Sequence, residues 1–204
     1  MTNTLVIGSY SETDHSALTT AFAPVFISGP DQVATLTDAI RAGITCVAFK
    51  GHHACKGEVM DLLPALGLIA NFGVGYDAID VAAASERGIK VTNTPDVLND
   101  DVADLAVGML LMQVRELEHA SAWARSGAWA AKGEYRLNRK FSGGKVGILG
   151  LGRIGREIAD RLAAFKMDIH YYARSEKETP NWTYHADPVS LADAVDYLVV
   201  ALVG

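Results

Sequence analysis

The amino-acid sequence predicts an α/β protein built on parallel sheets, and three patterns in its 204 residues carry that prediction. Short apolar runs in the first half start about 20 residues apart, with helix-compatible segments between them, as repeated βα units require. Each run is apolar throughout rather than alternating, which is typical of a strand covered on both faces. A glycine pattern then follows a further apolar run that ends at residue 149. The chain is therefore expected to hold two α/β domains.

The first half is expected to form an open, doubly wound, flavodoxin-like sheet. Its strands are predicted at Leu5–Ile7, Pro24–Ile27, Thr45–Phe49, Leu68–Asn71 and Lys90–Thr92. Asp31–Arg41 is predicted as one connecting helix, because Val33, Leu36 and Ile40 share a face at helical spacing. Residues 1–98 are assigned to this domain.

A long helix is predicted next, from Asn99 to about Trp123. Asn99 or Asp100 can cap it, because either side chain accepts hydrogen bonds from first-turn N–H groups. Its apolar positions cover more surface than packing on one sheet requires, at Val102, Leu105, Met109, Met112 and Leu117. Such a helix packs against a second subunit or between two domains of one chain, and the sequence leaves both readings open.

Residues 126–144 turn to Gly, Lys, Arg and Asn and are interpreted as a linker, so residues 99–144 are assigned to the interdomain helix and linker. The second α/β unit is predicted over residues 145–204, with elements at Val146–Leu149, Arg153–Phe165, Asp168–Tyr172, near Tyr184, at Val189–Ala194 and at Tyr197–Leu202. A doubly wound nucleotide domain normally has about six strands. Because fewer are found here, we expect a truncated chain with an incomplete Rossmann domain.

Composition and charge narrow the classes of function. Half of the residues are hydrophobic and 21% are charged, as in a globular protein. The net charge of −6 argues against nucleic-acid binding, yet residues 132–177 hold 11 basic and 5 acidic residues. That segment indicates one specific anionic ligand, with chance clustering on a solvated helix face as the alternative.

The sequence shows no targeting or membrane signal. No Lys or Arg precedes Arg41, so the basic region of a signal peptide is missing. The longest apolar run, Val102–Val114, is interrupted by Asp104 and is too short to span a bilayer. Cys46 and Cys55 are too few for a disulfide framework. A cytoplasmic protein with no membrane partner is expected.

The clearest motif is VGILGLGRIG at 146–155, in which Gly150, Gly152 and Gly155 form GxGxxG between a predicted strand and a predicted helix. These glycines permit a tight turn, the close approach of a pyrophosphate, and close packing of helix on strand. The N–H groups at Arg153 and Ile154 are expected to point at the phosphates. A glycine-rich turn without a ligand is the alternative. The predicted cofactor-binding set is completed by Leu151 and, at the end of the last strand, Ala201 and Leu202.

The end of the next strand predicts which dinucleotide binds. An NAD site places Asp or Glu there to accept the ribose 2′-hydroxyl. Here the strand runs into Arg174, no carboxylate stands at the expected place, and Ser175 and Lys177 offer further donors. A guanidinium fork suits a 2′-phosphate, so NADP(H) is predicted. An ordinary surface Arg, with Glu176 supplying the acid of an NAD(H) site, is the alternative.

Three segments together resemble the D-isomer-specific 2-hydroxyacid dehydrogenases, namely NFGVGYDAID at 71–80, VTNTPDVLNDDVADLA at 91–106 and VGILGLGRIG at 146–155. Their order and spacing match across nearly the whole chain. Ala-Arg-Ser at 173–175 is most similar to the NADPH-dependent glyoxylate/hydroxypyruvate reductases of that family, since NAD-using members usually carry Asp in place of Ala173. The resemblance implies a substrate domain completed by a C-terminal return, an inserted nucleotide domain, and a homodimer built largely on the long helix.

The resemblance also implies substrate-binding residues. Gly73, Val74 and Gly75 map onto the loop whose N–H groups bind the carboxylate of a 2-oxo acid, a role that suits an anion nest. A tight turn that needs glycine for its dihedral angles is the alternative. Lys50 and Gly51 follow the third predicted strand, where open α/β sheets bind ligands.

Two further groups of residues concern the nicotinamide and a metal. Val102 and Asp104 match family positions near the nicotinamide, although Asp104 also suits a first helical turn. His52, His53 and Cys55 suggest a metal, but they lack a fourth partner, so no metal site is predicted.

No catalytic residue is assigned. The resemblance implies an Arg that polarises the 2-oxo acid, a His that acts as general acid and a Glu that holds this His, all expected downstream of Gly204. None of the six histidines fits the family position. Trp123 and Trp129 are expected to pack, or one of them to reach the active site of a neighbouring subunit.

The implied reaction is hydride transfer from NADPH to glyoxylate, hydroxypyruvate or a similar small 2-oxo acid, giving the D-2-hydroxy acid. The alternatives are an NAD-linked phosphoglycerate or D-lactate dehydrogenase and a non-catalytic dinucleotide-binding sensor.

Overall fold

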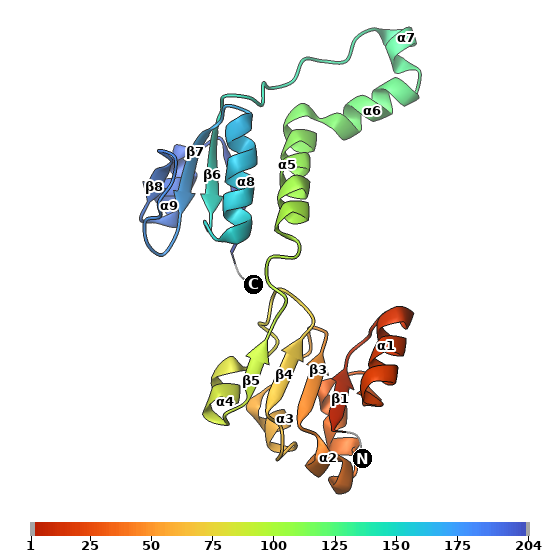
Figure 1. Cartoon of the computed structure of the whole chain (residues 1–204). Helices are drawn as coiled ribbons and strands as arrows, with labels where there is room; N and C mark the ends of the chain where they lie inside the picture. The colour runs from red at the N-terminus through yellow and green to blue at the C-terminus, as the bar shows by residue number, and fades with distance from the viewer. Residues whose placement is uncertain (1–2, 203–204) are drawn as a thin grey trace. The chain divides into compact units, whose positions relative to one another are not determined.

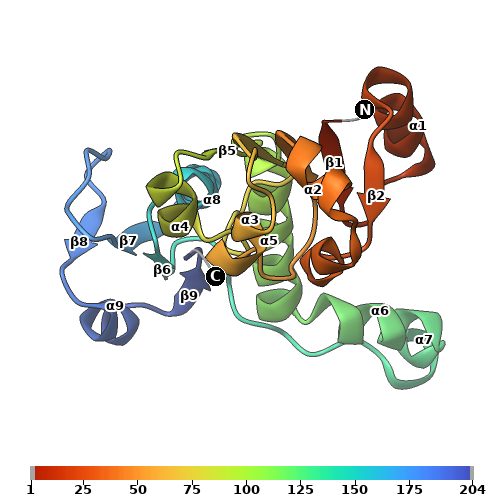
Figure 2. The same ribbon diagram turned by 90° about the horizontal axis from the view of Figure 1, so that it is seen from below.

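The computed structural model describes residues 3–202, which form two compact units. The first unit ends at Val97 and the second begins at Leu98, and each has its own buried hydrophobic core. Figure 1 labels most of the helices and strands of both units, and Figure 2 also labels β2 and β9. Within the described range, no helix combines the length and the apolar character needed to cross a bilayer.

The first unit contains a five-stranded parallel sheet with the strand order β2-β1-β3-β4-β5. Its strands are β1 (Thr4–Ile7), β2 (Val25–Ile27), β3 (Cys46–Phe49), β4 (Leu68–Asn71) and β5 (Lys90–Thr92). This is the flavodoxin-like order, so that part of the predicted fold class is confirmed. The inner strands β1, β3 and β4 contribute completely buried side chains such as Leu5, Val47 and Ile69, which explains their uniformly apolar sequences.

The connections of the first unit differ from the prediction at one place. They are α1 (Glu12–Phe22), the 3-10 helix η1 (Pro30–Thr35), α2 (Asp38–Gly43), α3 (Gly57–Asp61) and α4 (Val81–Glu86). The prediction of one helix over Asp31–Arg41 is wrong, because Leu36 is extended and Thr37 begins a new helix by accepting the N–H of Ile40. A threonine hydroxyl at this position is a favourable N-cap. Val33, Leu36 and Ile40 nevertheless pack against the same core.

The second unit contains a four-stranded parallel sheet with the order β8-β7-β6-β9. Its strands are β6 (Lys145–Leu149), β7 (Asp168–Tyr172), β8 (Thr183–His185) and β9 (Tyr197–Val200). Helices α8 (Arg153–Ala164) and α9 (Pro188–Ala194) cover opposite faces of this sheet (Figure 2), since Gly147 faces Leu191 of α9 while its neighbour Ile148 faces Gly155 of α8. The order matches four strands of the Rossmann arrangement, which confirms the second predicted fold.

The predicted long helix is divided in two. Helix α5 (Asn99–Arg115) stops at Glu116, whose φ of +48° turns the chain into α6 (Leu117–Arg125). The prediction that Asn99 or Asp100 caps α5 is also wrong, because Leu98 occupies the N-cap position. The expected linker contains a further short helix, α7 (Ala128–Lys132), and the last strand ends two residues before the predicted Leu202.

Helix α5 packs along α8 and is tied to it by an ion cluster around Arg161. The guanidinium donates to Asp100 Oδ1 at 2.6 Å, to Asp104 Oδ1 at 2.6 Å and to Glu157 Oε2 at 2.7 Å. Hydrogen bonds to these carboxylates, the one to Asp100 above all, hold the pKa of Arg161 above its ordinary value. Exposed ion pairs add little stability individually, but two pairs from one planar group to α5, held by a third within α8, fix how the two helices cross. Asp104 is therefore engaged with α8.

Two histidines link the neighbouring strands β7 and β8. His170 Nδ1 lies 2.9 Å from His185 Nε2, and His170 Nε2 lies 3.3 Å from Asp168 Oδ2. The outer nitrogen of His185 lies 3.2 Å from the hydroxyl of Ser190 on α9. One of the two facing ring nitrogens must donate and the other accept, so the pair is best formed with one ring neutral. Burial, and then the charge of His170, lower the pKa of His185.

This lowered pKa predicts a loss of stability in mild acid. As the pH falls below about 6.5, the unfolded chain protonates His185 more readily than the folded chain does, so the free energy of unfolding decreases. Denaturant titrations at pH values of about 7.5 and 5.5 should show a larger decrease for the wild type than for His185→Gln, because Gln does not titrate. Equal decreases in the two proteins would contradict the prediction.

Candidate functional site

The predicted cofactor turn lies between β6 and α8, and its three glycines are needed for different reasons. Gly150 has a φ of +105°, and a Cβ there would lie 2.6 Å from the carbonyl oxygen of Ala201. At Gly155 a Cβ would lie 2.1 Å from the carbonyl oxygen of Gly150. Both positions therefore exclude any side chain. At Gly152, in contrast, a Cβ would meet no atom within 4 Å, so the space beside it is open.

Helix α8 begins at this turn without a side-chain cap. Gly152 occupies its N-cap position and has no side chain to accept the first N–H groups, which include those of Arg153 and Ile154. Open space beside an uncapped helix N-terminus fits the phosphates of a dinucleotide, because the N–H groups and the helix dipole favour negative charge. The turn is anchored from within the unit, where the N–H groups of Gly150 and Leu151 both donate to the carbonyl of Tyr172.

The remaining predicted cofactor residues lie in four places. Arg174, Ser175 and Lys177 are exposed on the loop that leaves β7, and Lys177 Nζ donates to Ser175 Oγ at 3.4 Å. Among the described residues, no carboxylate is paired with Arg174, so its guanidinium is available. The other predicted cofactor residues lie outside this loop. Ala201 and Leu202 adjoin Gly150 at the end of β9. Leu151 is buried in the core, and Val102 lies in the first turn of α5.

In the first unit, the glycine loop after β4 holds its carbonyl groups inward. Asn71 is buried, and its Nδ2 donates to the carbonyls of Gly73 at 3.1 Å and Gly75 at 2.8 Å. Asn93 donates to the carbonyl of Val74 at 2.9 Å. Within residues 3–202, the N–H groups of these three loop residues make no hydrogen bond. Consecutive backbone N–H groups with no partner of their own form a concave site for an anion such as a carboxylate.

Asn71 and Asn93 were missed by the sequence analysis, although both lie inside the segments that carry the family resemblance. The available signal was a primary amide at the end of each of two neighbouring strands. Such an amide supplies two donors, which is what a loop with inward carbonyls requires.

The predicted Lys50 also lies at the carboxyl edge of the first sheet. Its Nζ lies 4.7 Å from the ring centre of Phe72 and 5.3 Å from that of Tyr10, so the ammonium contacts both aromatic faces. These three residues follow strands β3, β4 and β1, which are neighbours in the sheet. Burial, with a smaller contribution from Asp14, raises the pKa of Tyr10 to about 12, so its hydroxyl stays protonated. Gly51 is exposed beside Lys50.

The residues considered for a metal do not come together. His52 and His53 are exposed, whereas Cys55 is buried and its pKa is raised to about 11 by that burial. In the part of the chain that the structure describes, no three His, Cys, Asp or Glu side chains are placed to hold a metal ion.

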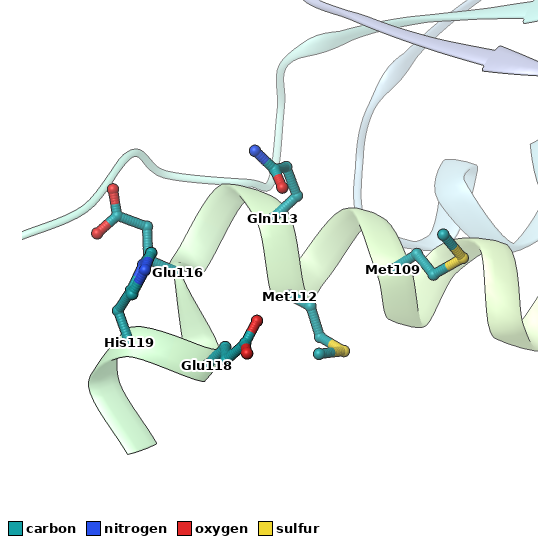
Figure 3. A pocket seen from close by; sticks show the side chains of 6 residues that line it. All are labelled: Met109, Met112, Gln113, Glu116, Glu118 and His119. Carbon is teal, nitrogen blue, oxygen red and sulfur yellow. The ribbon is translucent and has the colours of Figure 1, made fainter. Parts of the chain in front are cut away.

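Helix α5 has a second, exposed apolar face opposite the one that packs on α8. Four of the five predicted apolar positions lie on this outer face, and Leu105 and Met109 are 63% and 61% exposed, whereas Leu117 is the first residue of α6. A hollow of about 340 Å³ at its end is lined by Met109, Met112, Gln113, Glu116, Glu118 and His119 (Figure 3). Trp123 packs on Tyr135 and donates to the carbonyl of Gly133, whereas Trp129 is 59% exposed and does not pack within this chain.

Comparison with known proteins decides the family. The model of the D-isomer specific 2-hydroxyacid dehydrogenase catalytic domain matches residues 5–193, nearly the whole chain. The chain belongs to the D-isomer specific 2-hydroxyacid dehydrogenase family. A curated member, the hydroxyphenylpyruvate reductase of Plectranthus scutellarioides, is 44% identical over 171 residues, which are 84% of this chain and 53% of that protein. The glyoxylate/hydroxypyruvate reductase A of Arabidopsis thaliana is 43% identical over 176 residues, 86% of this chain and 56% of that protein.

Solved 2-hydroxyacid dehydrogenases share the fold. The enzyme of Ketogulonicigenium vulgare Y25 matches with a TM-score of 0.87 and 44% identity, covering 99% of this chain and 64% of its own. The NADPH-dependent glyoxylate/hydroxypyruvate reductase of Sinorhizobium meliloti, solved with NADP and malonate, matches with a TM-score of 0.86 and 40% identity, covering 100% and 63%. The chain thus spans little more than half the length of these curated relatives and less than two thirds of these solved chains.

The contrast between two glycines of the turn gives a prediction. Gly152→Ala should leave the free energy of unfolding within about 0.5 kcal/mol of wild type, because its Cβ meets nothing, and should weaken NADPH binding about tenfold by filling the open space. Gly155→Ala should instead cost about 1–3 kcal/mol of stability, because helix and turn must move apart. Denaturant unfolding and fluorescence titration with NADPH measure the two quantities. Gly152→Ala with full affinity would contradict the prediction.

Proposed function

We propose that this chain is the cofactor- and substrate-binding part of an NADPH-dependent reductase of small 2-oxo acids, of the glyoxylate/hydroxypyruvate type. The loop after β7 carries the proposal, because it presents Arg174, Ser175 and Lys177 where an NAD site would present a carboxylate. A guanidinium, a hydroxyl and an ammonium are the donors that a 2′-phosphate requires. Bound NADPH supplies the hydride for the carbonyl carbon of the substrate.

The substrate is proposed to bind at the carboxyl edge of the first sheet. Its carboxylate would be held by the outward N–H groups of Gly73, Val74 and Gly75, whose carbonyls are fixed by Asn71 and Asn93. Lys50 and Gly51, beside that loop at the end of β3, would contact the substituent at the far end of the substrate. Both glyoxylate and hydroxypyruvate carry the carboxylate this loop suits.

The choice of cofactor is tested by binding. The 204-residue chain is expected to bind NADPH more tightly than NADH in a fluorescence titration. Arg174→Ala should weaken NADPH binding about tenfold or more and leave NADH binding unchanged, since a charge-assisted hydrogen bond to a phosphate is lost. Lys140→Ala removes an exposed cation of the same unit and serves as the control for general electrostatic attraction.

A preference for NADH would overturn the proposal and would favour the alternative in which Glu176 accepts a ribose hydroxyl. With glyoxylate or hydroxypyruvate added, the absorbance at 340 nm follows NADPH oxidation. We expect turnover only from a polypeptide that also carries the Arg, Glu and His implied by the family resemblance. The 204-residue chain is expected to bind cofactor with little or no turnover.

We also propose that two copies associate through the outer face of α5. Leu105, Met109 and Met112 lie together on that face and are more than half exposed, and Leu117 continues it at the start of α6. A contiguous apolar face of this kind marks an interaction site on a protein surface. If a two-fold symmetry axis passes through this face, the α5 helix of each copy covers the α5 helix of the other.

Leu105→Glu should therefore convert a dimer to a monomer, because it introduces a charge into the proposed contact and leaves the packing on α8 untouched. Val189→Glu changes a residue of similar exposure on α9 and should remain dimeric. Light scattering after gel filtration gives the mass of each protein. A monomeric wild type, or a dimeric Leu105→Glu, would argue against this interface.

A further inference from the structure

The exposed loop that carries the predicted phosphate-binding side chains is closed by one buried hydroxyl. Tyr171 lies in β7 with its side chain completely buried. Its hydroxyl donates to the carbonyl of Lys177 at 3.0 Å and accepts the N–H of the same residue at 2.9 Å. A single side chain thus pairs with both the N–H and the C=O of Lys177, the two backbone groups that a neighbouring strand would otherwise bind.

A second contact holds the same loop from helix α8. Arg156 Nη2 donates to the carbonyl of Glu178 at 2.7 Å, and its guanidinium carbon lies 5.7 Å from the ring centre of Trp182. Residues 177 and 178 are therefore fixed on one side by the sheet and on the other by the helix that begins at the glycine turn. Between β7 and these two anchors, Arg174, Ser175 and Glu176 are exposed.

The hydrogen bonds that fix residues 177 and 178 have a consequence for anion binding. A loop that is already ordered loses less conformational entropy when it binds a ligand than a loop that must first be ordered. The Tyr171 contact also fixes the main chain of Lys177, whose ammonium donates to the hydroxyl of Ser175. Two of the three predicted phosphate donors are thereby held together before any ligand arrives.

We propose that Tyr171 is a positioning residue for cofactor selectivity: its buried hydroxyl pre-organises residues 173–177 to receive the 2′-phosphate of NADPH. This inference rests on the proposed function and adds to it a residue that touches neither cofactor nor substrate. Because NADPH carries a 2′-phosphate and NADH does not, loss of the hydroxyl lowers the affinity for NADPH and not the affinity for NADH.

The neighbouring tyrosine provides a matched control. Tyr172 is half-buried at the end of the same strand, and its side-chain hydroxyl makes no hydrogen bond among the described residues. Tyr171→Phe and Tyr172→Phe each remove one oxygen atom and keep the ring. In Tyr171→Phe the tilted ring contact with Tyr184 is also retained, so the core is expected to stay folded.

Two measurements on the 204-residue chain test the inference. Trypsin cuts after Arg174 and Lys177, so the cleavage rate at these sites reports how often the loop opens. Tyr171→Phe is expected to be cut there about fivefold faster than wild type, because the two hydrogen bonds between its hydroxyl and Lys177 are lost, with Tyr172→Phe unchanged. Fluorescence titration should show about fivefold weaker NADPH binding for Tyr171→Phe and the same NADH binding.

The outcomes separate this inference from the proposal on which it rests. If the wild type prefers NADPH and Tyr171→Phe keeps the wild-type ratio of the two affinities, the role of Tyr171 is overturned and the proposed function stands. Equal losses for NADPH and NADH would show that Tyr171 only stabilises the fold, which also overturns the inference. A wild type that binds both cofactors equally would overturn the proposed cofactor preference together with the role of Tyr171 in it. Unchanged trypsin cleavage would show that the hydroxyl does not order the loop.

Discussion

The close contact between the start of α8 and the turn after β6 is the constraint on which the second unit depends. Gly155 stands so near the carbonyl of Gly150 that no side chain fits between them. That contact determines where the first N–H groups of α8 point, and it brings α8 close enough for Arg156 to reach the loop after β7. The same helix then positions α5 through Arg161. One backbone-to-backbone contact thus orders the turn, the loop and the long helix.

Helix α5 packs on α8 through one face and exposes an apolar face on its other side. Ala103 and Val107 are buried against α8, while Leu105 and Met109, on the other side of the same turns, face outward. Small residues on the inner face allow the two helices to lie close, and the Arg161 cluster fixes their crossing. The outer face is consequently held in place by its own unit and does not need a partner to become ordered. This pre-organisation is what an apolar surface needs if it is to bind another copy with little entropic cost.

The sequence predicted those features that arise from local patterns. Apolar runs located the inner strands within one or two residues, because strands buried on both faces leave little choice of residue. The glycine turn was found for a similar reason, since its close contacts admit only one residue type at Gly150 and Gly155.

What the sequence did not reveal depends on contacts between distant residues or on a choice between equal local options. Glu116 adopts a left-handed conformation with neither Gly nor Pro to signal it, so the end of α5 was missed. Likewise, the side chains of Asn71, Asn93 and Tyr171 act by hydrogen-bonding to backbone groups outside their own strands. The residue type alone does not predict which backbone group each side chain will bind.

The inward carbonyls of residues 73–75 have an evolutionary consequence. An anion held there would be bound by main-chain N–H groups, which carry no titratable proton and are present whichever residue other than proline replaces Val74. Recognition of a carboxylate would then tolerate mutation as long as the two asparagines that orient the loop are kept. The aromatic residues and the lysine at the neighbouring strand ends are under no such restraint. Under the proposed function, changes at Tyr10, Lys50 and Phe72 would then alter which 2-oxo acids bind, while the carboxylate common to all of them would still be recognised.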